Sequence, residues 1–159
     1  SLTGRPGRVV TWDARLTAAD TPVTFADVEE MGFGVRLVRE LSPKWGGRYR
    51  AAHGGQDEKG VFGTQADWCD ASGTIGGTRV GVTLIDRGTG GRRSFYHARD
   101  YGWLLANPFG RRSYTKGDSG AITLAPGGEL DLHFSLLVHG DLPDEALPEF
   151  VAAALAGVR

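Results

Sequence analysis

Apolar side chains recur at every second position from Leu130 to Val138 in LDLHFSLLVHG (130–140), and this pattern limits the folds that are open to the chain. Successive side chains of a β-strand point to opposite faces, so His133 and His139 would face outward with Asp131 and Ser135. The side chains expected to face a core are Leu130, Leu132, Phe134, Leu136 and Val138. Similar alternation recurs in three other segments, at residues 9–18, 34–40 and 78–86. The chain is therefore expected to form several half-buried β-strands.

Glycine supplies 25 of the 159 residues, about twice a usual share of roughly 7%. Many glycines stand in pairs between the apolar runs, where their positive φ suits tight turns. APGGE at 125–129 predicts a hairpin turn, and the glycine-rich stretch 44–63 predicts a long irregular loop. Only the tail has helix signals, with Asp141 as N-cap, Pro143 early and Gly157 at the end, and Pro148 is expected to delay the regular helix. The fold class predicted is all-β, an antiparallel β-sandwich or jelly roll with a C-terminal helix packed outside the sheets.

The length fits a single domain covering residues 1–159. Eighteen Lys and Arg against nineteen Asp and Glu give a net charge of −1, which does not suggest a nucleic-acid partner. The chain has neither an apolar run of about 18 residues nor a signal-peptide start, so we expect a soluble protein, cytoplasmic by default, without a membrane partner. Cys69 is the single cysteine, expected to pack in the core rather than act as a nucleophile.

Residues 95–110, FYHARDYGWLLANPFG, combine charged side chains with many aromatic rings. If residues 95–102 form one strand, His97, Arg99 and Tyr101 lie on one face, about 7 Å apart. An imidazole, a guanidinium and a phenol in a row offer proton transfer, anion binding and a hydroxyl donor. We therefore take these three residues as candidate catalytic residues facing one open hollow. The alternative is a half-buried histidine with Arg99 and Asp100 in ion pairs.

Further candidates come from two other segments and from the rest of residues 95–110. In ADWCDASG (66–73), Trp68 and Asp70 share a strand face, with Asp70 a second proton-transfer candidate and Trp68 a stacking surface for a sugar. A core tryptophan beside a turn-capping carboxylate is an equally good interpretation. Glu30 could form an acid–base pair with Asp70, and Asn107 is first expected to cap backbone groups. The complete set of remaining candidate ligand contacts is Glu30, Arg36, Asp100, Trp103 and Asn107.

The histidines show no metal-binding spacing, and no glycine-rich piece matches a phosphate loop, so neither a metal nor a cofactor is expected. GDSG at 117–120 is similar to the nucleophile motif of trypsin-like proteases. The histidine stretch and the spacing of those proteases are missing, and we interpret the motif as a turn.

Five strings together resemble a bacterial family known as PmoA-like, or "methane oxygenase PmoA". They are VTFADVEEMGFGVRL, ADWCDASG, VGVTLIDR, FYHARDYGWLLANPFG and LDLHFSLLVHGD. The resemblance covers nearly the whole chain and is strongest at residues 95–110. It implies a β-sandwich, corresponding to the C-terminal part of a larger, mutarotase-like supersandwich, and a role near sugar-processing enzymes. The chain lacks the family's histidine-rich N-terminal half and has Asp86-Arg87-Gly88 where members have a DHP element. This implies a homo-oligomer or a missing N-terminal half.

Three hypotheses follow for the function. The first is a carbohydrate-active enzyme of the epimerase, lyase or hydrolase type, with His97 as acid and base; the oxygenase activity in the family's label is not expected without a membrane span. The second is a non-catalytic carbohydrate-binding module that uses Trp68, Tyr101 and Trp103 as stacking surfaces. The third is a structural module. In the first two cases, the ligand is a small molecule or glycan.

Overall fold

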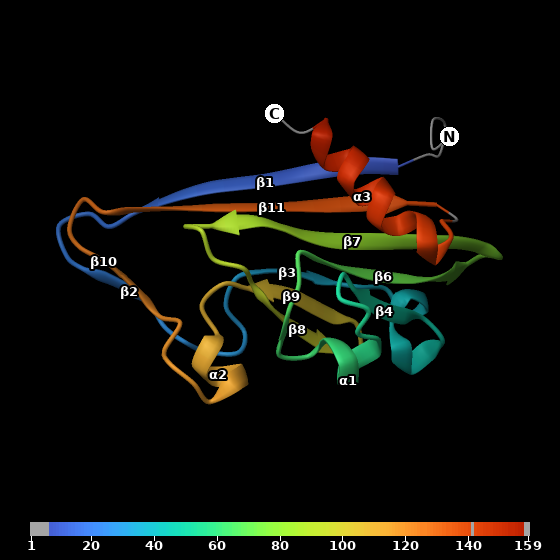
Figure 1. Ribbon diagram of the computed structural model, residues 1–159, viewed down its shortest axis with the longest axis horizontal. Helices are drawn as coiled ribbons and strands as arrows, with labels where there is room; N and C mark the ends of the chain where they lie inside the picture. Colours follow the sequence, from blue (N-terminus) through green and yellow to red (C-terminus); the bar gives the residue numbers. More distant parts are fainter. Residues whose placement is uncertain (1–6, 141, 158–159) are drawn as a thin grey trace.

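Two antiparallel sheets pack face to face and enclose the main core of the protein (Figure 1). The computed structural model describes residues 7–140 and 142–157. The five-stranded sheet has the order β1 (Gly7–Thr17), β11 (Glu129–His139), β7 (Thr78–Thr89), β6 (Trp68–Ile75) and β4 (Arg48–Ala51). The four-stranded sheet has the order β3 (Phe33–Arg36), β9 (Trp103–Asn107), β8 (Phe95–Arg99) and β5 (Thr64–Gln65). A small third sheet pairs β10 (Ile122–Leu124) with β2 (Val23–Phe25).

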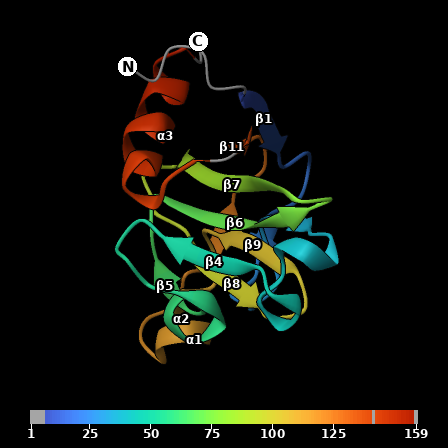
Figure 2. The same ribbon diagram turned by 90° about the vertical axis from the view of Figure 1, so that its right-hand side faces the viewer.

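The helices lie on the outer surfaces of this sandwich. On the four-stranded side are α1 (Asp57–Val61) and α2 (Arg111–Thr115), whereas α3 (Leu147–Ala156) lies against the five-stranded sheet (Figures 1 and 2). Three 3₁₀ turns complete the fold, namely η1 (Arg39–Leu41), η2 (Pro43–Trp45) and η3 (Asp144–Ala146). Leu147 and Val151 of α3 pack on Ile85 and Leu137 of the sheet. The predicted all-β sandwich with a C-terminal helix outside the sheets is confirmed.

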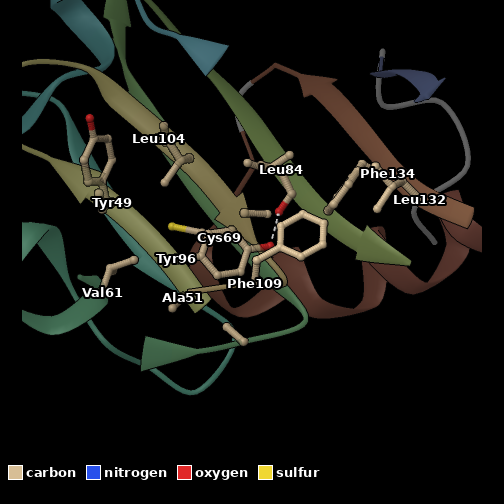
Figure 3. Packing of buried hydrophobic residues seen from close by; sticks show 14 of the residues in the cluster. Tyr49, Ala51, Val61, Cys69, Leu84, Tyr96, Leu104, Phe109, Leu132 and Phe134 are labelled. Atoms are coloured by element: carbon tan, nitrogen blue, oxygen red, sulfur yellow. Dashed lines mark hydrogen bonds between the residues drawn. The ribbon is translucent and has the colours of Figure 1, made fainter. Parts of the chain in front are cut away.

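The core contains an aromatic stack between the two sheets. Phe134 of β11 and Phe33 of β3 stack with ring centroids 5.3 Å apart, and Trp12 of β1 stacks on Phe33 at 5.1 Å. Farther along the core, the Tyr96 hydroxyl donates to the carbonyl oxygen of Leu84 over 2.9 Å, which satisfies a buried polar group (Figure 3). These contacts tie the two sheets together.

Cys69 is buried in the same core, on the opposite face of β6 from Trp68, as predicted. Burial raises the pKa of its thiol well above the usual value. The neutral thiol packs as a small apolar group.

The alternation along β11 correctly predicts which side chains are buried only from Leu130 to Phe134. From Ser135 onward the outward side chains are buried too, because α3 covers that face; His139 is buried rather than exposed to solvent. Val138 points inward yet is 45% exposed, and Val10 of β1 is more exposed still. The four-stranded sheet does not cover this end of the longer strands.

Three local predictions require correction. Strand 34–40 is shorter, because β3 ends at Arg36 and η1 follows. The turn at 125–129 does not join a hairpin, since β10 pairs with β2 and β11 with β1. The segment 44–63 is not one irregular loop, because it contains β4 and α1. The predicted N-cap Asp141 lies outside the described residues, and α3 ends before Gly157 as predicted.

Candidate functional site

The segment 95–110 forms β8, a turn and β9, and its two faces have different roles. Tyr96 and Ala98 point inward to the core. Phe95, His97 and Arg99 alternate with them and share the outer face, as predicted. Tyr101 does not continue this row, because the strand ends at Arg99 and residues 100–102 form the turn to β9. The predicted row of three candidate catalytic side chains is therefore wrong at its third member.

His97 is sealed beneath packed side chains. Its exposed fraction is 0%, with the ring of Phe62 edge-on at 5.1 Å and that of Tyr114 at 6.4 Å. Neither ring nitrogen has a hydrogen-bond partner among the described residues, and Nε2 lies 3.6 Å from Oε1 of Glu30. Burial, followed by the charge of Arg99, lowers the pKa of His97, which favours a neutral ring. The expected open hollow at His97 is not present, because Phe62 and Tyr114 fill that space.

Replacement of His97 tests whether this ring only fills space. We expect His97→Leu to raise the free energy of unfolding by about 1 kcal/mol, because it removes two unpaired buried nitrogens at similar volume. Urea denaturation measures this change. A loss of stability of about 1 kcal/mol or more would show that the imidazole makes a favourable polar contact in solution.

The remaining polar candidates on this face are held in pairs. Arg99 donates to Glu58 over 3.0 Å and lies over the ring of Phe62. Arg36 lies over the rings of both Tyr101 and Trp103, at 5.4 and 5.1 Å. The expected ion pair forms for Arg99, with Glu58, whereas the Asp100 carboxylate has no ion-pair partner among the described residues and only the backbone N–H of Asp100 donates to Glu58. The face is thus closed by ion pairs and cation–π contacts rather than opened as a cleft.

Trp68 and Asp70 lie on the outer face of the five-stranded sheet, beneath α3. Trp68 is 7% exposed and packs in the cluster under the helix, so it offers no stacking surface to a ligand. Asp70 accepts from the Thr83 hydroxyl and pairs with Nε2 of His139, each over 2.8 Å. Both sheets and the core separate Asp70 from His97 and Glu30, which lie on the other side of the sandwich. The expected joint acid–base role of these residues is therefore wrong.

Two polar side chains fix the loops around α2. Asn107 donates to the carbonyl oxygens of Val28 and Glu29 and accepts from the N–H of Phe109, which confirms its predicted capping role. Asp27 accepts from the backbone N–H groups of residues 112, 113 and 120. Although burial opposes ionisation, these hydrogen bonds lower the pKa of Asp27 to about 2. A fixed carboxylate thus holds α2 against the chain that precedes β3.

A hollow with a volume of about 210 Å³ lies at the end of β8 next to these loops. We call it the arginine hollow, and its lining residues are Gln65, Arg92, Arg93, Phe95, Pro108, Arg111, Ser119 and Gly120. Three arginines line one space, with Arg92 donating to the carbonyl oxygen of Gly120, and Phe95 and Pro108 give it an apolar wall. Arg111 has no ion-pair or hydrogen-bond partner for its guanidinium within residues 7–140 and 142–157, and its charge is therefore free for a ligand.

A second hollow of about 310 Å³ adjoins the first through Arg92 and Arg93. We call it the acidic annex, because Asp67 and Asp86 line it together with Arg87. Asp86 accepts from the N–H groups of Gly88 and Ser94 and so shapes the connection from β7 to β8. Arg93 pairs with Asp67 over 2.8 Å, which links the two hollows.

The sequence contains a signal for this site that neither the strand alternation nor the aromatic segment reveals. The tetrapeptide GRRS occurs twice, at residues 91–94 and 110–113, on either side of the aromatic segment. The first copy follows β7 and the second begins α2, and the fold brings Arg92, Arg93 and Arg111 to one hollow. The Asp86 carboxylate accepts a hydrogen bond from the backbone N–H of Ser94 in the first copy. The Asp27 carboxylate accepts one from the backbone N–H of Ser113 in the second copy.

Other types of site receive no support within the described ranges. No group of three His, Cys, Asp or Glu side chains there could hold a metal ion. No helix in the same ranges has the length and apolar character needed to cross a membrane.

The protein is thus an antiparallel β-sandwich with an arginine-lined hollow at the end of one sheet. A family model described as "Family of unknown function (DUF6807)" matches residues 1–152, and the chain belongs to this family. No curated protein and no solved structure matches the chain. The family description does not bear on the resemblance to PmoA-like proteins, which stays a prediction.

Proposed function

We propose that the protein binds an acidic saccharide, without converting it, in the arginine hollow and the acidic annex. The observation that carries the proposal is the convergence of Arg92, Arg93 and Arg111 on one hollow with an apolar wall. A guanidinium presents paired N–H donors that match the two oxygens of a carboxylate. The three arginines would hold the acidic group of the sugar.

The rest of the ligand would contact two different surfaces. Phe95 and Pro108 offer an apolar wall for the C–H face of a sugar ring. Asp67 and Asp86 in the annex supply carboxylate oxygens that accept hydrogen bonds from sugar hydroxyls. This combination favours a charged saccharide over a neutral one and over a purely apolar ligand.

The geometry favours binding over catalysis because the acid–base candidates are not available. His97 is sealed, and Asp70 lies under α3 on the other side of the sandwich. Catalysis by His97 would require Phe62 and Tyr114 to move aside, and the Tyr114 hydroxyl is anchored to the carbonyl oxygen of Glu29. The enzyme hypothesis is therefore the second candidate.

The test is isothermal titration of the protein with uronic-acid disaccharides and with their neutral counterparts. We expect measurable binding of the acidic disaccharide only, weakened at least about tenfold by Arg111→Ala, since a charge-assisted bidentate contact contributes roughly 1.5–3 kcal/mol. Arg15→Ala is the matched control. Arg15 is an exposed arginine of β1 paired with Asp131, on a strand that does not line the hollow, and its loss should leave the affinity unchanged.

The same samples separate the two candidate functions. Equal binding of the neutral disaccharide, or full affinity in Arg111→Ala, would contradict the proposal. Product formation that is lost in His97→Leu would instead support the enzyme hypothesis. Binding without product, retained in His97→Leu, is the expected result.

A further inference from the structure

We propose a second, separate binding site, for a phosphate group, on the outer face of the five-stranded sheet beside the foot of α3. A hollow of about 230 Å³ lies there, lined by Arg48 of β4, Ser72 and Thr74 of β6, and Arg79 of β7. This site does not depend on the function proposed for the arginine hollow, which lies at the end of the other sheet.

The backbone register explains why the arginines meet here. Arg48 pairs with Ser72 and Arg50 with Asp70 in the β4–β6 ladder, while Arg79 pairs with Thr74 in the β6–β7 ladder. All three arginines therefore lie along one outer surface, and each reaches Asp144 of η3 from it. The cluster is built from three neighbouring strands rather than from a flexible loop.

One carboxylate does not balance this cluster. Arg48 binds both carboxylate oxygens of Asp144, Arg79 donates to Oδ1 over 3.1 Å, and Arg50 lies 3.9 Å from Oδ2. Asp70, another acid on the same face, is paired with His139 over 2.8 Å. Arg48 and Arg79 line the hollow and share this one carboxylate, so a net positive charge remains there, which attracts an anion.

The donors are placed for an anion that has several oxygens. Arg48 donates through Nε to the Ser72 hydroxyl over 3.2 Å, which fixes its guanidinium plane at the wall of the hollow. For Arg79, only Nη2 has a hydrogen-bond partner among the described residues, so Nε–H and Nη1 remain as donors. The Thr74 hydroxyl adds a further donor. A phosphate group accepts at three or more oxygens and fits this set better than a carboxylate, for which Asp144 already fills the bidentate position.

Asp144 has a defined role in this site, since its negative charge repels a second anion beside it while its contacts hold the arginines in place. The Arg48 hydrogen bonds lower the pKa of Asp144, so it is charged at neutral pH. Neutralising this carboxylate should tighten phosphate binding, and removing an arginine should weaken it.

The experiment is a calorimetric titration, with inorganic phosphate and phenyl phosphate as probes and chloride at equal ionic strength as the blank. We expect saturable phosphate binding by the wild type, at least tenfold weaker binding by Arg79→Ala, and about threefold tighter binding by Asp144→Asn. Tighter binding of phenyl phosphate would identify a phosphate ester as the ligand, and tighter binding of inorganic phosphate would identify the free ion. Circular dichroism confirms that each variant is folded.

Three outcomes would overturn the proposal. They are no saturable binding by either the wild type or Asp144→Asn, unchanged affinity in folded Arg79→Ala, and loss of phosphate binding in Arg111→Ala. The last result would place the phosphate in the arginine hollow. Loss of saccharide binding in Arg111→Ala together with loss of phosphate binding in Arg79→Ala would establish two independent sites.

Discussion

Asp70→Ala is expected to lower the free energy of unfolding by about 3–5 kcal/mol, because it leaves a charged partner buried without its counter-ion. The His139 ring lies under α3 and donates through Nε2 to Asp70 and through Nδ1 to the carbonyl oxygen of Gly140. Two acceptors around one ring require both nitrogens to carry protons, which is the charged form. The Thr83 hydroxyl would lose its acceptor as well. Urea denaturation at constant pH measures the effect.

Asp131→Ala is the matched control, since Asp131 also pairs with a cation from a neighbouring strand but is exposed. We expect this change to cost less than about 1 kcal/mol. A cost for Asp70→Ala as small as that of the control would contradict the charged, buried pair.

The pH dependence of stability tests the same pair independently. Burial alone would lower the pKa of His139, but the hydrogen bond and charge of Asp70 and the Gly140 carbonyl raise it above 6.5. The contribution of the pair is therefore complete below pH 6.5 and is lost as the pH rises through the folded pKa. In Asp70→Ala, burial becomes the largest influence on the pKa of His139 and lowers it. Stability should then fall as the pH drops below about 6.5, because the unfolded chain binds the proton more readily than the folded protein.

Phe134→Ala is the other change with a large expected effect, a loss of about 3–5 kcal/mol. Phe134 has no exposed surface and stacks on Phe33 of the opposite sheet with an interplanar angle of 12°. Its truncation would leave a cavity between two sheets whose backbones are fixed by their ladders, so the space cannot close fully.

Val138→Ala provides the comparison on the same strand and the same sheet face. Because Val138 is 45% exposed beyond the end of the four-stranded sheet, its truncation should cost less than about 1 kcal/mol. Similar losses in the two variants would mean that the sheets do not pack as described. Thermal and urea unfolding of both variants decide the point.

The sandwich could be predicted from the sequence because period-two alternation and glycine turns are local signals. Residues 130–134 obey the alternation, whereas Ser135 and His139 break it because α3, which follows β11 in the chain, folds back over that face of the sheet. The same limit applies to strand ends, since nothing local shows that β8 stops at Arg99 and leaves Tyr101 in a turn.

The arginine hollow contains none of the residues that the sequence analysis proposed for a site, because a strand face can be identified without knowing what covers it. His97 and Arg99 do share a face, but Phe62, which follows α1, and Tyr114 of α2 pack over the histidine and seal it. Asp70 and His97 were expected to act together in proton transfer because both are titratable, yet their strands belong to different sheets. The repeated GRRS was readable in the sequence, but its meaning depends on the fold that joins the two copies.

The most direct test of the central claim is an NMR titration that follows the Nε–Hε signals of the arginine side chains during addition of a uronic-acid disaccharide. The signals of Arg92, Arg93 and Arg111 should move together and saturate, while those of Arg48 and Arg79 stay in place. Unchanged signals for the three hollow arginines, or equal shifts with the neutral disaccharide, would contradict an acidic-saccharide site in the arginine hollow.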